Sequence, residues 1–153
     1  MIDYKKLKIL RDKTGISISL CKKALEETRN NLNDAEKLLN KWGVEKVKDK
    51  VKKITPQGAI FSYVHHNRKI ASLIELLCET DFVATNSDFL KLGQELAMQV
   101  ASMPAKDNSE LEKQSYVRDP SKKIADLIKE AIFKFGENIK IGNFQRWEIG
   151  ESL

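Results

Sequence analysis

The sequence predicts an α+β fold, with a three-helix bundle at the N-terminus followed by a small core of antiparallel strands packed with helices. Three observations support this class. Apolar residues recur at helical spacing through residues 1–43, β-branched and aromatic residues gather after residue 56, and helical spacing returns from about residue 86. We therefore divide the chain into a bundle (1–43), a basic helical linker (44–55) and a core domain (56–153).

The composition is that of a globular protein. Of the 153 residues, 41% are hydrophobic and 32% charged, which excludes wholesale disorder and collagen-like repeats. The longest stretch without charge, Ile54 to Asn67, contains Pro56 and Gly58 and is too short to span a bilayer. The first residues lack the apolar segment of a secretory signal. We expect a cytoplasmic protein of a bacterium, or one made inside an organelle, with no membrane partner.

Positive charge is concentrated in the first third of the chain. Residues 1–55 carry 15 Lys and Arg against 8 Asp and Glu, whereas residues 56–153 carry 12 against 14. Val44 to Lys53 reads VEKVKDKVKK, which is typical of a solvated helical linker or of a nucleic-acid-binding patch. No aromatic or arginine side chain interrupts these lysines to stack on bases or to grip a phosphate. We therefore favour the linker and expect no requirement for nucleic acid.

Two short helices open the bundle. The first is predicted over about residues 3–13, and Gly15 follows it as a C-terminal stop. The second begins near Ser17, whose hydroxyl can cap the helix, and its apolar stripe includes Cys21. We therefore expect Cys21 to lie in the core of the bundle.

A third helix is predicted to begin with Asn33 as N-cap, because Glu36 stands three residues later as in a capping box. Its apolar stripe runs to Trp42, and Gly43 is expected to close it. Three helices with one apolar stripe each must bury these stripes against one another, so they form a bundle.

The period then shortens to that of strands. Residues 57–66 and 69–78 are rich in apolar, β-branched and aromatic residues, and Asn67-Arg68 between them is a plausible turn. Together they predict an antiparallel hairpin.

The remainder of the core is expected to mix helices with one more strand. An apolar stripe predicts a helix over residues 86–103, and the polar residues 104–120 form a loop with at most one short helical turn. Asp119-Pro120 is expected to begin another helix as N-cap and first residue, and Gly136 to end it. Residues 138–148 then predict a closing strand.

The residues that could support catalysis are few. The seven glycines form no phosphate-binding loop. His65 and His66 are neighbours on a predicted strand and would point to opposite faces, so they could not share a metal ion. Cys78 stands beside acidic residues, which would raise its pKa and weaken it as a nucleophile. We therefore expect neither an enzyme nor a metal or cofactor site.

One segment stands out between the second predicted strand and the following helix. It reads Cys78-Glu79-Thr80-Asp81-Phe82-Val83-Ala84. Phe82 could pack into the core of the domain while Asp81 caps a turn. Alternatively, Phe82 and Asp81 could form an exposed tip that a rigid turn presents to a partner. The pattern by itself leaves both alternatives open.

Two long motifs resemble the elongation factor Ts family. Leu10–Gly15 (LRDKTG), followed by Cys21–Leu25 (CKKAL), is similar to the opening motif of the family at the same spacing. Glu75–Ala84 (ELLCETDFVA) is similar to its second signature. Gly136–Ile139 (GENI) is a weaker match. The likeness runs in order through nearly the whole chain and implies an N-terminal bundle of ubiquitin-associated type before an α+β core.

The chain also departs from the family pattern. Leu20 stands where an acid is usual, Leu77 replaces the usual Asn, and Thr85 replaces a basic or amide residue. The long helical excursion of the family is nearly absent from residues 104–120, and only one copy of the core subdomain is present.

The resemblance implies a function in translation. Members of the family are guanine-nucleotide exchange factors that bind elongation factor Tu, GDP-bound or nucleotide-free, disturb its Mg²⁺ site and promote release of GDP. The implied contacts in the Mg²⁺-dislocating motif are Thr80, Asp81, Phe82 and Val83. The implied contacts in the bundle are Arg11, Ile18 and Ser19.

The resemblance further implies that short members can form homodimers in which a second subunit stands in for the missing core copy. Two other function classes remain open from the residues alone. The basic first third is compatible with an RNA-binding module, and a small helical bundle is compatible with a protein-interaction adaptor.

Overall fold

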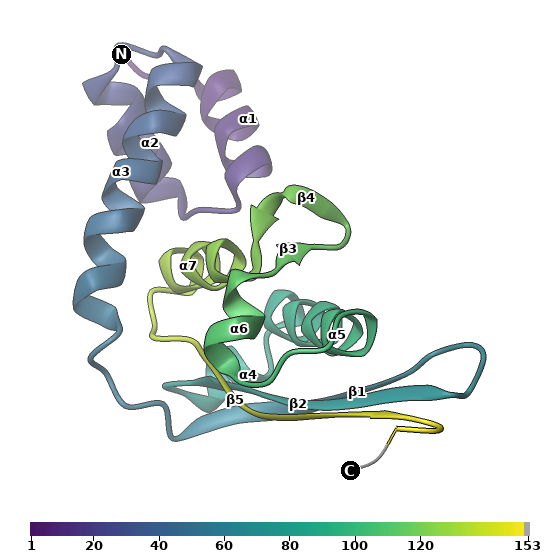
Figure 1. Cartoon of the computed structure of the whole chain (residues 1–153). Helices are drawn as coiled ribbons and strands as arrows, with labels where there is room; N and C mark the ends of the chain where they lie inside the picture. Colours follow the sequence, from purple (N-terminus) through teal and green to yellow (C-terminus); the bar gives the residue numbers. More distant parts are fainter. Residues whose placement is uncertain (152–153) are drawn as a thin grey trace.

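The computed structural model describes residues 1–151 and confirms the α+β class (Figure 1). A bundle of α1 (Tyr4–Thr14), α2 (Ile18–Glu27) and the N-terminal part of α3 (Leu32–Lys50) precedes a core built on a three-stranded sheet. Within these described residues, no helix combines the length and the apolar character that crossing a membrane requires.

The ends of α1 and α2 follow the sequence prediction. Asp3 caps α1 by accepting from the backbone N–H groups of the first turn, and Gly15 ends it in the left-handed conformation, with φ 68°. The hydroxyl of Ser17 accepts from the N–H of Leu20 at the start of α2. Cys21 is fully buried, as predicted.

The predicted limits of the third helix were wrong at both ends. Asn31, not Asn33, is the N-cap, because its Oδ1 accepts from the N–H groups of Asn33 and Asp34 at 3.1 and 3.2 Å. Gly43 does not end the helix, which continues to Lys50 and includes most of the predicted linker. Gly43 lies inside the helix because it provides space for a ring: a Cβ on it would lie 3.1 Å from Cδ1 of Phe133. The division into domains stays a prediction.

The predicted hairpin and closing strand are confirmed. Strands β1 (Gln57–Val64) and β2 (Ile70–Cys78) are antiparallel, and β5 (Lys140–Glu148) pairs antiparallel with the free edge of β2, so the sheet order is β1-β2-β5. The turn at Asn67 forms as expected, with its Oδ1 accepting from the N–H of Lys69 at 2.9 Å.

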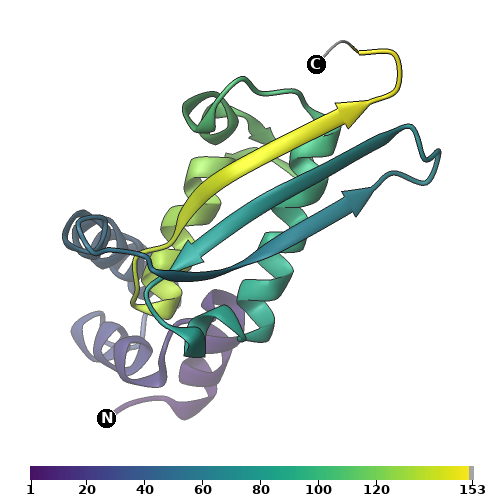
Figure 2. The ribbon, with the colours of Figure 1, turned by 90° about the horizontal axis from the view of Figure 1, so that it is seen from below.

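In the part of the chain that the structure describes, helices cover only one face of this sheet. Helix α5 (Ser87–Ser102), which the apolar stripe of residues 86–103 predicted, packs across β1 and β2. Figure 2 shows the three strands in front of the helices, with no helix of the described chain on the near face. The enclosed core contains aromatic and aliphatic side chains from both layers, among them Phe61, Ile74, Leu76, Phe89, Leu96, Ile128 and Ile141.

Between α5 and the closing strand, one prediction is confirmed and one is wrong. The short helical turn is present as α6 (Asn108–Lys113). Asp119-Pro120, however, does not begin a helix, because these residues belong to β4 (Asp119–Lys123), which pairs with β3 (Ser115–Tyr116). The carboxylate of Asp119 accepts from Ser121 within its own turn and is not available as a cap. Helix α7 (Ile124–Phe135) begins later and ends at Gly136, as predicted.

Residues near the end of α7 join the bundle to the core. Phe133 packs against the buried cluster of the bundle, beside Gly43. The ammonium group of Lys134 pairs with Asp88 of α5 at 2.8 Å, and the same side chain lies against Gly15. The two parts of the chain are therefore in direct contact through consecutive side chains of one helix.

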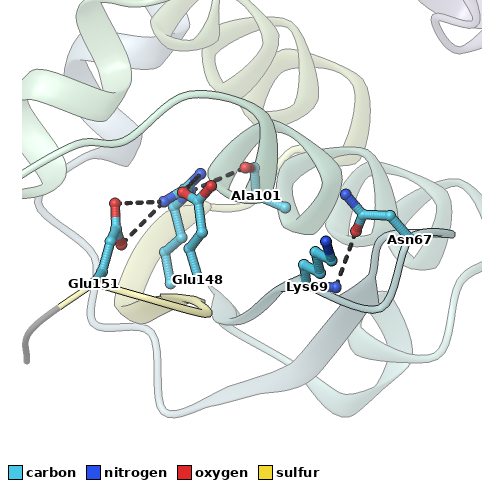
Figure 3. A network of polar contacts seen from close by, with 6 residues as sticks. Asn67, Lys69, Ala101, Glu148 and Glu151 are labelled. Atoms are coloured by element: carbon cyan, nitrogen blue, oxygen red, sulfur yellow. Dashed lines mark hydrogen bonds and ion pairs between the residues drawn. The ribbon is translucent and has the colours of Figure 1, made fainter.

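A polar network fixes the far end of β5. The mostly buried side chain of Arg146 donates from Nε to the carbonyl of Ala101 at 3.0 Å and from Nη2 to Glu148 at 2.9 Å (Figure 3). It also pairs with Glu151 at 3.3 Å. These bonds attach the last strand to the C-terminal end of α5.

Candidate partner-binding corner between β2 and α4

The chain turns sharply between the central strand and the helical layer, at residues 79–83, which we call the corner. Strand β2 ends at Cys78, and the single-turn helix α4 (Asp81–Ala84) follows. Thr80 is the N-cap: its backbone is extended, and its hydroxyl accepts from the N–H of Val83 at 3.3 Å. The extended cap followed at once by a helical turn projects the first helical residues away from the sheet.

Phe82 is the tip of this corner and is 85% exposed, so that among the described large hydrophobic side chains only Met1 is more exposed. Its neighbour Asp81 is also exposed, whereas Val83 is buried and anchors the turn in the core. The exposure of the tip is therefore confirmed, and packing of Phe82 into the core is wrong, whereas contact of the tip with a partner stays a prediction. Single exposed apolar residues are common, but a Phe ring with almost no intramolecular contact is an unusual arrangement.

A carboxylate from a distant part of the sequence holds the corner. Oε1 of Glu137 accepts from the N–H groups of Glu79 and Thr80 at 3.1 and 3.0 Å, and its Oε2 accepts from the Thr80 hydroxyl at 2.7 Å. In return, Oε1 of Glu79 accepts from the N–H of Asn138 at 2.8 Å. Four hydrogen bonds thus join the corner to the loop between α7 and β5.

Acidic side chains surround the thiol of Cys78 at the corner. Burial raises the pKa of the Cys78 thiol, and the nearby charges of Glu137 and Asp81 raise it further. The thiol donates to the carbonyl of Thr80 at 3.2 Å. Within residues 1–151, the carboxylates of Glu79, Asp81 and Glu137 make no ion pair. A neutral, hydrogen-bonded thiol is a poor nucleophile, and the corner is better suited to contact than to covalent chemistry.

The candidate contact residues of the bundle lie at the connection between α1 and α2. Arg11 is exposed in the last turn of α1, Ile18 is the first residue of α2 and is 49% exposed, and the Ser19 hydroxyl lies 3.2 Å from that of Ser17. Figure 1 shows the bundle at the top of the view and α4 beside the sheet at the bottom, and both lie away from the turn between β1 and β2.

The structure also corrects the description of the two histidines. Strand β1 ends at Val64, so His65 and His66 lie in the turn and do not point to opposite faces of a strand. Their rings are adjacent, with centroids 4.1 Å apart, and Nδ1 of His65 lies 3.0 Å from the hydroxyl of Tyr63. Among the described residues, no three His, Cys, Asp or Glu side chains are grouped as metal ligands would be.

Sequence reasoning missed the role of Glu137. Its partners are more than fifty residues away in the chain, and no local pattern identifies a carboxylate as the acceptor for a distant turn. The only signal in the sequence was the weak match of Gly136–Ile139 to the family pattern. It pointed to this loop but gave no role for Glu137.

Comparisons with known proteins decide the family. The family model described as "Elongation factor TS" matches residues 79–153, beginning at the first residue of the corner. Proteins named elongation factor Ts from Thermosipho melanesiensis and Thermotoga maritima are 36% and 38% identical to the chain, over 99% and 95% of it and 100% and 94% of their own lengths. The chain belongs to the elongation factor Ts family.

As a member of the elongation factor Ts family, the chain is a translation elongation factor. A third relative, elongation factor Ts of Methylacidiphilum infernorum, is 34% identical over 96% of the chain and 94% of its own length. These three alignments extend over 188 to 196 positions, more than the 153 residues of this chain, so the relatives contain segments that it lacks.

Proposed function

We propose that this chain is a guanine-nucleotide exchange factor that binds elongation factor Tu and promotes release of its GDP. The observation that carries the proposal is the 85% exposure of Phe82 on a turn that four hydrogen bonds hold in place. A large apolar ring kept out of its own core at a rigid position has the properties of a contact residue. The activity makes and breaks no covalent bond, and we place it in the cytoplasm or the organelle interior where translation occurs.

The proposed mechanism follows from thermodynamic linkage. If the chain binds the GTPase more tightly when nucleotide is absent, nucleotide must bind the complex more weakly by the same factor. Burying the ring of Phe82 in the partner contributes roughly 1.5–3 kcal/mol, which corresponds to a factor of about 10 to 150. The ring therefore supplies a substantial part of the required coupling.

Asp81 has a separate proposed role beside the Mg²⁺ ion that the GTPase holds. Mg²⁺ requires near-ideal octahedral coordination, so a small displacement of its ligands weakens its binding. Asp81 is exposed next to Phe82 at the start of α4, and an added carboxylate there would disturb the surroundings of the ion when the ring enters the partner. Thr80 and Val83 contribute by holding the turn.

The bundle supplies the second proposed contact with elongation factor Tu. Arg11, Ile18 and Ser19 are exposed together around the connection of α1 and α2. Contacts made equally in the presence and absence of nucleotide increase affinity without changing the release rate. We therefore assign anchoring to the bundle and displacement of nucleotide to the corner.

We further propose that two copies of the chain associate through the open face of the sheet. Ile60, Leu73 and Trp147, one from each strand, are 70%, 50% and 57% exposed on the face that no described helix covers. The occupant that we favour is the same face of a second subunit, because an isologous contact between two such faces would bury both.

The decisive experiment measures release of a fluorescent GDP from elongation factor Tu by stopped flow. Phe82→Ala should slow the release at saturating factor by at least about tenfold, as loss of the ring's burial requires. Val44→Ala is the matched control, because it shortens a 60% exposed apolar side chain on α3, outside both contact regions, and should leave the rate unchanged. Equal rates for Phe82→Ala and the unmodified chain would reject the proposal.

The same preparations test the other function classes. An RNA-binding module would retain RNA on a filter with an affinity that falls steeply with salt, and an adaptor would bind elongation factor Tu without accelerating release. Either result, with no acceleration by the unmodified chain, would replace the proposed function.

A further inference from the structure

We propose that Glu137 is a positioning residue for nucleotide exchange: its carboxylate sets the direction in which Phe82 projects. This inference rests on the proposed function. Glu137 itself lies outside both proposed contact regions, the corner and the bundle. Glu137 reaches the corner from the loop after α7 and contacts Glu79 and Thr80, but not Phe82 itself.

The corner needs such support because its own structure is short. Helix α4 has four residues, and a single helical turn is not stable by itself in water. The ring of Phe82, 85% exposed, gains almost no packing energy from its own subunit that could fix its direction. The orientation of the tip therefore depends on the buried side chain of Val83 and on the hydrogen bonds that hold residues 79, 80 and 83.

Glu137 accepts three of these bonds. One oxygen accepts from two consecutive backbone N–H groups, and the other accepts from the hydroxyl of the N-cap, Thr80, at 2.7 Å. The same hydroxyl accepts from the N–H of Val83, so the carboxylate also orients the cap of α4. Removing the carboxylate releases all three donors at once and frees the strand–helix turn to populate other conformations.

The loop that carries Glu137 is itself held. Asn138, only 4% exposed, donates from Nδ2 to the carbonyl of Lys53 at 2.8 Å, just beyond the end of α3. Its N–H donates to Glu79 at 2.8 Å. The carboxylate of Glu137 is therefore placed by a loop attached to both the corner and the end of the long helix.

Replacement by glutamine separates positioning from a direct effect of charge. The Oε1 of a glutamine can accept from both backbone N–H groups, and its amide can donate to the Thr80 hydroxyl. Glu137→Gln therefore keeps the bonds and removes the charge, whereas Glu137→Ala removes both. If the carboxylate acted on the partner through its charge, the two variants would be equally defective.

The experiment measures exchange efficiency, the release rate per concentration of factor, for Glu137→Ala and Glu137→Gln with Phe82 intact and with Phe82→Ala. We expect Glu137→Ala to lower efficiency about tenfold, as when only a tenth of the molecules hold the competent corner. Glu137→Gln should stay within about threefold of the unmodified chain because it keeps the bonds. When Phe82→Ala is already present, adding Glu137→Ala should lower the exchange efficiency by less than about twofold, because the side chain that Glu137 orients is gone.

Glu130→Ala is the control. It removes a carboxylate of α7 that pairs with Lys122, away from the corner, and should leave the efficiency unchanged. Hydrogen exchange of the Glu79 and Thr80 amides should accelerate in Glu137→Ala and remain slow in Glu137→Gln. If Glu137→Ala does not fold, Thr80→Val and Thr80→Ser test the hydroxyl that bonds to both Glu137 and Val83, because only serine keeps it.

The outcomes separate the two proposals. Full efficiency of Glu137→Ala, equal defects in the alanine and glutamine variants, or an undiminished loss in the Phe82→Ala background would each overturn the positioning role while leaving the exchange function intact. Normal exchange by Phe82→Ala alone would instead overturn the proposed function.

Discussion

Gly93 of α5 lies directly against the ring of Phe61 from β1: a Cβ on residue 93 would overlap three atoms of the ring. Both residues are buried, and the ring also lies 6.4 Å from that of Phe89, centroid to centroid. The helical layer thus meets the sheet at the distance that only glycine allows.

Gly93→Ala should therefore destabilise the fold by about 1–3 kcal/mol, the usual cost of inserting a methyl group into a packed core. Urea unfolding monitored by circular dichroism would measure this cost. Shortening the opposing ring with Phe61→Leu should recover part of the loss in the double variant. A Gly93→Ala variant as stable as the unmodified chain would show that the helix can move away from the sheet at no cost.

If the bundle anchors elongation factor Tu as proposed, Arg11→Ala should weaken the complex without changing the maximal release rate. Loss of a hydrogen bond to a charged group costs about 1.5–3 kcal/mol, so the half-saturating concentration should rise about tenfold or more. A titration of release rate against factor concentration separates the two parameters. Lys41→Ala removes an exposed cation from α3 as the matched control. A lower maximal rate in Arg11→Ala would contradict pure anchoring.

Stability should fall as the pH rises between about 10 and 12, in part through Tyr116. Burial, the hydrogen bond that its hydroxyl donates to Glu95 at 2.7 Å, and the charge of that carboxylate raise the pKa of Tyr116 from 10.0 to about 12. Because the folded chain keeps a proton that the unfolded chain loses, the stabilisation is complete below pH 10 and is lost as pH rises through the folded pKa.

Unfolding free energies of the unmodified chain and Tyr116→Phe, measured across this alkaline range, would check that sign. The phenylalanine variant has no phenol to ionise, so its stability should decline less steeply. Parallel curves for the two proteins would assign the decline to other groups.

The unmodified chain should sediment as a dimer, and Leu73→Lys as a monomer. Leu73 lies on the central strand, in the middle of the open face of the sheet, where two lysines brought together would repel and lose their hydration. Ile54→Lys places the same charge on an 82% exposed residue outside the sheet and should leave the dimer intact. A monomeric unmodified chain at micromolar concentration would rule out the association.

Local signals in the sequence predicted most of the fold. Ser17 and Gly15 mark helix ends by bonds made within a few residues, so their roles could be derived from the chain itself. Asn67 likewise forms its turn through a bond to the second residue after it. The β-branched, aromatic and apolar residues of β1 and β2, with a turn sequence between them, predicted their pairing.

The wrong predictions of secondary structure occurred where contacts with residues outside the local pattern determine the conformation. Gly43 is a residue type that often ends a helix. It nevertheless lies within α3, because the ring of Phe133, ninety residues later, packs against it. Asp119-Pro120 has the pattern of a helix start, but the pairing of Tyr116 with Asp119 makes it part of a hairpin. The exposure of Phe82 could not be derived from its pattern either, and the support by Glu137 depends on a contact across the sequence.

Because α3 is one continuous helix, it limits how far the bundle and the corner can move relative to each other. Its 19 residues form a strut about 28 Å long, and the carbonyl just past its end is bonded to the loop that holds the corner. The helix begins in the bundle, so it connects the two regions that we propose to contact the GTPase, the bundle and the corner. A partner that binds at both places would therefore have to adapt to the separation that α3 sets between them.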